Sequence, residues 1–247
     1  MKKTLLILIL FLNFCFAENI DKLKIFAAVE GYAQKPFYEW KSGAIEPEGF
    51  DIEVIKAVSK KLNKKITFYK IDLDRSWKDL RKELLDEKLV DIVIYAYSIT
   101  DERKKTVLFS RPNFTTTMGA LVLKNSHINS IEKLKKSSVL ALEHTTGFQW
   151  AKKNVTGGIN QYLKFTTIED LLLTGKVDAF LGDMVHLKSI ANGDQRFKVL
   201  KQPLQKESLG IAVNKENSGL MEKINDALKE LQKSGELDRI KKKFFSK

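Results

Sequence analysis

Residues 88–103 read KLVDIVIYAYSITDER, an apolar run followed by a polar tip. The run from Val90 to Tyr95 has the length and the apolar, partly β-branched composition of a buried strand. Thr100 carries a side chain that caps helices well, so a short helix is expected to begin directly after this tip. A buried strand that leads through polar residues into a helix is typical of α/β folds, in which ligands bind beyond the carboxyl ends of the strands.

The same pattern recurs along the chain. Predicted strands span residues 23–29, 66–69, 139–142, 177–181 and 209–213, and predicted helices begin near residues 51, 76, 130, 145, 167 and 218. The segment KVDAFL at 176–181 echoes KLVDIV at 88–93, which indicates two lobes built on one plan, with largely parallel sheets. Because no Pro/Gly/Ser-rich linker separates these units, we expect the chain to cross between the lobes more than once.

The first residues have the pattern of a secretory signal. Two lysines precede an apolar run at residues 5–12, and the segment CFA at 15–17 offers small residues at the positions that a signal peptidase reads. We expect cleavage after Ala17 and a periplasmic protein that begins at Glu18. A retained anchor helix and a lipidated Cys15 are the alternatives. Cleavage would remove the only cysteine of the chain, so no disulfide is expected.

The composition is strongly basic, with 43 Lys+Arg against 31 Asp+Glu and a formal net charge of +12. Such an excess can attract nucleic acid or an anionic surface. The lysines are spread along predicted helix faces without an aromatic platform beside them, so we interpret them as solvent-exposed and expect no nucleic-acid partner. The histidines at 127, 144 and 186 do not have metal-ligand spacing, and neither a metal nor another cofactor is expected.

The polar tips have the chemistry to hold both ends of a zwitterion. Arg103 offers a planar fork that matches a carboxylate, and backbone N–H groups near Ser98 and Thr146 add donors. Asp183, together with the Ser98 hydroxyl and the Ala96 carbonyl, can accept from an ammonium group. Each of these side chains also has a plainer interpretation, as an exposed surface cation or as a helix N-cap.

Three motifs together resemble those of the family 3 extracellular solute-binding proteins, the polar amino-acid receptors of ABC importers. PEGFDIEVIKAV at 47–58 is similar to GFDxDLxxAI, SITDERKK at 98–105 with FSRP at 109–112 is similar to TITxERxxxxxFSxPY, and KVDA at 176–179 with Asp183 is similar to GxVDAxxxD. The resemblance implies an α/β, two-lobed periplasmic-binding-protein fold of type II with two crossings. It divides the chain into a signal peptide at 1–17, lobe I at 18–116 plus 209–247, and lobe II at 117–208.

By this resemblance the protein is a monomer that captures a free amino acid between its lobes and delivers it to the permease of an inner-membrane ABC transporter. Arg103 with the backbone at Ser98 and Thr146 would hold the α-carboxylate, and Asp183, Ser98 and Ala96 the α-amine. The expected ligand-binding residues are Arg103, Asp183, Ser98, Ala96, Thr146, Thr145, Trp77, Glu30, Tyr32 and His144. Trp77 and Tyr32 would cover the ligand side chain, and His144 stands where the family usually has Gly. Since Glu30 has no assigned partner, we favour a polar or cationic amino acid over aspartate or glutamate.

An enzyme is the alternative function. The same scaffold resembles that of periplasmic cyclohexadienyl or arogenate dehydratases, for which Glu30, Glu143 and His144 are the acid or base candidates near the tips. No Ser/His/Asp order, metal cluster or phosphate loop accompanies them, so we expect a binding protein without enzymatic activity. The sensing domain of a receptor is disfavoured, since no transmembrane helix follows Lys247.

Overall fold

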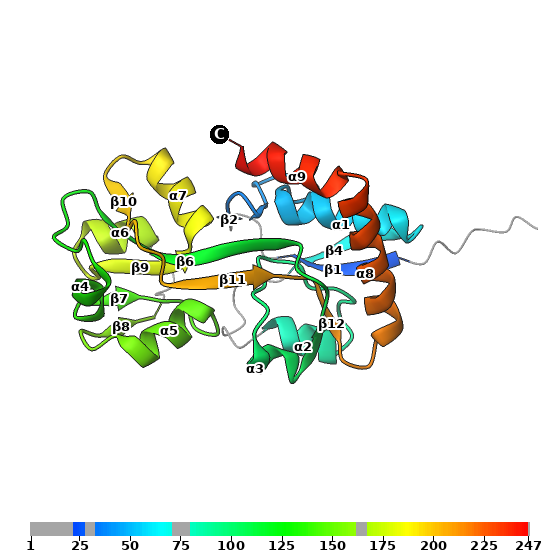
Figure 1. Ribbon diagram of the computed structural model, residues 1–247, viewed down its shortest axis with the longest axis horizontal. Helices are drawn as coiled ribbons and strands as arrows, with labels where there is room; N and C mark the ends of the chain where they lie inside the picture. Colours follow the sequence, from blue (N-terminus) through cyan, green and yellow to red (C-terminus); the bar gives the residue numbers. More distant parts are fainter. Residues whose placement is uncertain (1–21, 28–32, 71–79, 162–166, 247) are drawn as a thin grey trace, which may run out of the picture.

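A computed structural model describes residues 22–27, 33–70, 80–161 and 167–246 of the chain. It shows two lobes connected by two long strands (Figure 1). The predicted signal peptide and three predicted site residues, Glu30, Tyr32 and Trp77, lie outside the described residues. Within these ranges, no helix combines the length and the apolar character needed to cross a membrane.

The first lobe combines early and late parts of the chain. β1 (Lys22–Ala27) and β4 (Lys65–Lys70) pair in parallel, β5 (Val107–Phe109) pairs antiparallel with β12 (Ala212–Asn214), and β2 (Ala33–Gln34) with β3 (Tyr38–Glu39). The helices are α1 (Phe50–Lys61), α2 (Leu80–Asp86), α3 (Asp101–Lys104), α8 (Ser218–Lys233) and α9 (Glu236–Phe245). One buried core joins them, to which β1, α1 and α8 contribute Ile25, Phe50 and Ile224.

Among the described residues, one sheet of six strands runs through the second lobe. Its order is β10 (Phe197–Val199), β6 (Phe114–Leu123), β9 (Ala179–Asp183), β7 (Val139–Leu140) and β8 (Ile159–Asn160), and β11 (Gln205–Leu209) also pairs with β6. The helices are α4 (Ile131–Lys135), α5 (Thr146–Asn154), α6 (Ile168–Leu173) and α7 (Met184–Gly193). β7 is parallel to β8 and β9, but β6 is antiparallel to β9, β10 and β11. The expectation of largely parallel sheets is therefore wrong for this lobe.

Successive residues of the second-lobe strands fill two cores, one on each face of the sheet. Ala120 and Val122 of β6 pack into one buried cluster, whereas Leu121 packs into the other. In β9, Leu181 packs into the first of these clusters and Phe180 into the second. This alternation follows from the two-residue period of a strand, and it explains why these segments are apolar throughout rather than alternating with polar residues.

β6 and β11 are the crossings between the lobes (Figure 1). They pair antiparallel from Phe114 opposite Leu209 to Met118 opposite Gln205. The chain thus crosses between the lobes more than once, as the sequence predicts. Because the two crossing strands are hydrogen-bonded to each other, they form one continuous floor under the space between the lobes.

Two predicted strands differ from the structure. The segment at 209–213 is split between β11 and β12, because the chain changes its pairing partner from β6 to β5 there. Gly210 packs tightly at this break, since an added Cβ would lie 2.9 Å from Cδ1 of Ile99. The segment at 90–95 is buried as predicted, but its pairing with other described residues is limited to two isolated bridges, Ile25 to Ile92 and Val93 to Ala212.

Candidate functional site between the lobes

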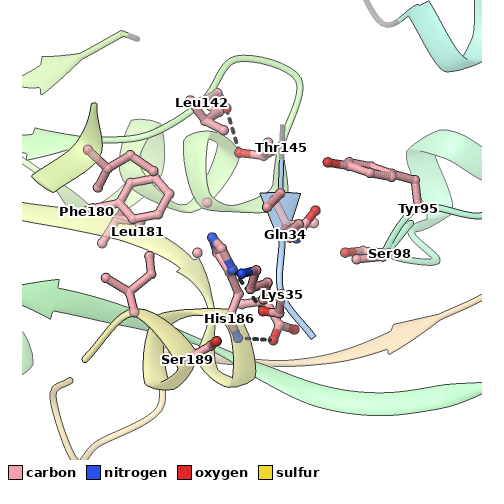
Figure 2. Close-up of a pocket in the computed structure, with 18 of the residues that line it drawn as sticks. Gln34, Lys35, Tyr95, Ser98, Leu142, Thr145, Phe180, Leu181, His186 and Ser189 are labelled. Atoms are coloured by element: carbon pink, nitrogen blue, oxygen red, sulfur yellow. Dashed lines mark hydrogen bonds between the residues drawn. The ribbon is translucent and has the colours of Figure 1, made fainter. Parts of the chain in front are cut away.

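A cleft of about 650 Å³ is lined by residues of both lobes and of the crossing strand β11. Figure 2 shows Tyr95 and Ser98 on the first-lobe side, with Phe180 and Leu181 on the second-lobe side. Gln34 and Lys35 of the β2 segment lie between the two sides. This volume falls within the range of small-molecule sites. In the described part of the chain, no group of three or more His, Cys, Asp and Glu side chains is placed to hold a metal ion.

Arg103 lies in α3, where both lobes meet the cleft. Its Nη1 donates to the Ser98 carbonyl at 2.8 Å, and its Nη2 donates to the His144 carbonyl of the second lobe, also at 2.8 Å. The guanidinium carbon lies 4.4 Å from the ring centroid of Tyr97. These contacts hold the planar guanidinium in one orientation at the cleft, as bidentate recognition of a carboxylate requires.

The first-lobe tip is shaped by the backbone at Ala96. This residue has a φ of 41°, and its N–H donates to Oδ2 of Asp51 at 2.6 Å. Burial raises the pKa of Asp51 to about 7, although the Ala96 amide and the Asn113 side chain favour the charged form. Directly after this turn, the Ser98 hydroxyl donates to Oε2 of Glu207 on β11 at 3.2 Å.

The N-terminus of α5 reaches the cleft from the second lobe. Thr145 is its N-cap, with a hydroxyl that accepts from the Phe148 amide at 3.2 Å and donates to the Leu142 carbonyl at 2.5 Å. The amides of Thr146 and Gly147 stand in the first turn, where a helix provides no internal acceptor. His144 has a left-handed φ of 59°, a conformation that glycine adopts most readily. This helix start therefore offers amide donors to an anion.

Asp183 uses its two carboxylate oxygens differently. Oδ1 caps α7 by accepting from the amides of Val185 at 2.8 Å and His186 at 3.3 Å. Oδ2 is buried and accepts no hydrogen bond of standard geometry among the described residues, although the Thr116 hydroxyl lies close enough to stabilise the charge. Burial raises the pKa of Asp183 to about 6, and the nearby charge of Glu207 acts in the same direction, whereas the amides and the Thr116 hydroxyl favour the charged form. The cap is therefore compatible with the ligand-binding role that the sequence predicts for Asp183, because the two need different atoms.

His186 makes a second contact between the lobes. Its Nδ1 lies 3.0 Å from the Lys35 carbonyl, so Nδ1 carries the proton and Nε2 is an acceptor (Figure 2). Burial lowers the pKa of this imidazole, against opposing effects of the Lys35 carbonyl and the Glu169 charge. The side chain is therefore neutral at pH 7.

The described members of the predicted site line this one cleft. They are Arg103, Asp183, Ser98, Ala96, Thr146, Thr145 and His144. The cleft also contains residues that the sequence did not single out, namely Gln34, Glu169, Phe180, His186 and Glu207. Glu207 and Leu209 are the buried residues of β11, but the mostly polar sequence of this strand gives no local signal that Glu207 points inward.

Comparisons with known proteins agree with this arrangement. The sequence profile of the bacterial extracellular solute-binding proteins, family 3, matches residues 28–247. The ABC transporter glutamine-binding protein GlnH of Bacillus subtilis (strain 168) is 31% identical over 205 residues, which cover 81% of this chain and 73% of that protein.

Solved structures share the same fold. An ancestral arginine-binding protein bound to glutamine superimposes with a TM-score of 0.80 at 32% identity, covering 92% of this chain and 98% of that one. The arginine-, lysine-, histidine-binding protein ArtJ of Geobacillus stearothermophilus gives a TM-score of 0.78 at 30% identity, covering 92% and 96%.

These relatives are named as binding proteins, and none of those described here is named as a dehydratase or another enzyme. The two lobes, the two crossings and the cleft between the lobes are the type II binding-protein architecture that the motifs imply. By profile, sequence identity and fold, the chain belongs to the bacterial extracellular solute-binding proteins, family 3.

Proposed function

We propose that this protein binds a free α-amino acid in the cleft and delivers it to the permease of an ABC transporter. One observation carries the proposal: the cleft presents donors and an acceptor that match the two charged ends of a zwitterion. Arg103 and the first amides of α5 supply donors for the carboxylate, and the buried Oδ2 of Asp183 supplies an acceptor for the amine. The ligand completes both sets of bonds only when the lobes are together.

The charges of the cleft favour a polar or cationic side chain. Glu143 and Glu169 line the second-lobe wall, as does His186, whose imidazole is neutral at pH 7. The Lys35 ammonium is paired with Glu39 at 2.8 Å, so it is already neutralised by an acid of its own lobe. The relatives named for glutamine, histidine and arginine support the same class.

The proposal extends to location and assembly. A signal peptide at residues 1–17 is cleaved after Ala17, and the mature protein acts in the periplasm as a monomer. Lobe I comprises residues 18–116 plus 209–247, and lobe II comprises residues 117–208. The separate cores of the two lobes and the family membership support this division.

A ligand screen tests the proposal. The chain from residue 18 onward would be unfolded, dialysed and refolded to remove any bound ligand, and then heated with each of arginine, lysine, histidine, glutamine, cystine, glutamate and aspartate. A ligand at a hundred times its Kd adds about 2.7 kcal/mol to the free energy of unfolding, so a true ligand gives a clear rise in Tm.

Calorimetry with the best ligand and with its α-N-acetyl derivative completes the test. We expect the derivative not to bind, because acetylation removes the positive charge that Asp183 requires. A chain that gains no stability from any amino acid, or that binds the acetylated form equally well, contradicts the proposed function. Binding of aspartate or glutamate alone contradicts only the proposed ligand class.

A further inference from the structure

Glu207 is a buried carboxylate on the crossing strand β11. Only 8% of its surface is exposed, and it lines the same cleft as Asp183. Its Oε2 accepts from the Ser98 hydroxyl, whereas its Oε1 is buried without a hydrogen-bond partner in the described structure. An unpartnered carboxylate oxygen in the interior is costly, so this atom is available as an acceptor for a donor that a ligand brings.

The pairing of the strands places Glu207 and Asp183 on one face of the sheet. Glu207 is opposite Thr116 in the β11–β6 ladder, and Asp183 is opposite Met118 in the β9–β6 ladder. Paired residues share a face, and so do residues two apart in one strand, so all four side chains point to the same side. Glu207 and Asp183 thus flank β6 from its two neighbouring strands, and each presents one buried, unpartnered oxygen.

The acceptors at this end of the cleft match the donors of one ammonium group. A primary ammonium carries three N–H donors. Oδ2 of Asp183 and Oε1 of Glu207 are two acceptors, and the Ser98 hydroxyl, which gives its proton to Glu207, keeps lone pairs for the third. The three acceptors come from the second lobe, the crossing strand and the first lobe.

Resting on the function proposed above, we propose that Glu207 is a second anionic recognition residue for the ligand's α-ammonium group. It accepts one N–H through Oε1 and orients the Ser98 hydroxyl through Oε2. Because β11 connects the lobes, an ammonium group bound here contacts the crossing strand as well as both lobes. The site therefore selects strongly for a primary amine over an uncharged substituent of the same size.

The test replaces Glu207 by Gln, which keeps the shape and removes the charge. The wild type, E207Q and the charge-matched surface control E216Q would be titrated by calorimetry with the best amino acid and with its des-amino analogue, in which hydrogen replaces the α-amine. We expect E207Q to bind the amino acid about tenfold to a hundredfold more weakly, the usual effect of losing a hydrogen bond to a charged group. It should bind the des-amino analogue no more weakly than the wild type does, and E216Q should match the wild type with both.

Two results would overturn the assignment: an unchanged Kd of E207Q for the amino acid, or equal losses for both ligands, which indicate a structural role. Carbon-13 NMR of the wild type, labelled at glutamate carboxyls, provides a readout that does not depend on the folding of a variant. The Glu207 signal should shift with the amino acid and not with the des-amino analogue, and a signal unmoved by either ligand contradicts the proposal. A wild type that binds no amino acid at all refutes the proposed function instead, so the two failures are distinguishable.

Discussion

At the scale of single residues, the proposed ligand-binding groups of the cleft use some atoms for the fold and leave others for the ligand. Asp183 lines the cleft and caps α7 with Oδ1, whereas its buried Oδ2 accepts no hydrogen bond of standard geometry among the described residues. Arg103 binds two backbone carbonyls, one from each lobe, and thereby fixes the plane of its guanidinium. From the sequence, a cap and a ligand-binding residue were competing interpretations, because both require the same side chain at the start of a helix.

Replacing Arg103 tests the carboxylate anchor. Arg103→Ala should weaken amino-acid binding by about 2–5 kcal/mol, because it leaves the ligand carboxylate desolvated and unpaired. Arg103→Lys should also bind weakly, since a single ammonium cannot replace a planar fork that bonds two carbonyls and a carboxylate. Calorimetry measures both, with Arg111→Ala, an exposed arginine, as the control. Wild-type affinity in Arg103→Ala would exclude the assignment.

The buried Asp51 gives the stability of the ligand-free protein a defined pH dependence. Its folded-state pKa, about 7, is above the ordinary value of 3.8, so the folded state binds the proton more tightly than the unfolded state does. The contribution of Asp51 to the free energy of unfolding should therefore rise as the pH falls from 8 to 5. The rise should be a few kcal/mol, because each unit of pKa difference is worth about 1.4 kcal/mol. Asp183, whose pKa is raised to about 6, acts in the same direction.

Asp51→Asn isolates this effect, because the amide keeps an oxygen for the Ala96 N–H. Urea unfolding should show a smaller difference in the free energy of unfolding between pH 8 and pH 5 for the variant than for the wild type. The variant should exceed the wild type in stability most clearly at pH 8, where the wild-type Asp51 is charged. The control is Glu216→Gln, which alters an exposed carboxylate. An identical pH difference in the wild type and Asp51→Asn would show that Asp51 is not the titrating group.

At the scale of elements, what could be predicted depends on how local the stabilising interactions are. Thr100 and Thr167 cap α3 and α6 as predicted, since a cap is decided within four residues. β11 was missed because Gln205–Leu209 is mostly polar and is held by pairing with β6, far away in the sequence. The mixed pairing of the second-lobe sheet was missed for the same reason. Glu207, the strongest new site residue, lies on the strand that local patterns could not predict.

The start of α1 depends on a glycine. Gly49 has a φ of 131°, and an added Cβ would contact the Phe37 carbonyl and lie 2.8 Å from the Tyr38 nitrogen. Backbone atoms cannot move aside as flexible side chains do, so Gly49→Ala should destabilise the protein by about 2 kcal/mol or more. Gly219→Ala is the matched control, because no atom of the described residues lies within 4 Å of an added Cβ and alanine favours helix α8. Urea unfolding that shows equal stability for the two variants would contradict this account.

At the scale of the whole molecule, the two lobes are joined by the hydrogen-bonded crossing strands β6 and β11. Across the cleft, Arg103 reaches the His144 carbonyl and His186 reaches the Lys35 carbonyl. A ligand that bonds to both lobes has a higher affinity for the closed arrangement, and this differential affinity is what shifts a population towards closure.

Small-angle scattering measures that closure. The radius of gyration should decrease when the best amino acid saturates the protein, and it should stay constant with the α-N-acetyl derivative. Arg103→Ala, studied at the same ligand concentration, should keep the ligand-free profile. Identical profiles of the wild type with and without saturating ligand would show that binding does not close the lobes.

The separate cores have a consequence for the order in which the lobes can be completed as the exported chain emerges from its N-terminus. The second-lobe cores are filled by one continuous stretch, from Ala120 to Leu200, whereas the first-lobe core joins Leu23 to Leu237. A chain that grows from its N-terminus can therefore complete the second lobe while the first still lacks Ile224, Leu228 and Leu231 of α8. The first-lobe segments near the N-terminus therefore cannot complete their core until the C-terminal helices are available. Until the final helices arrive, the growing chain has no route to a closed cleft.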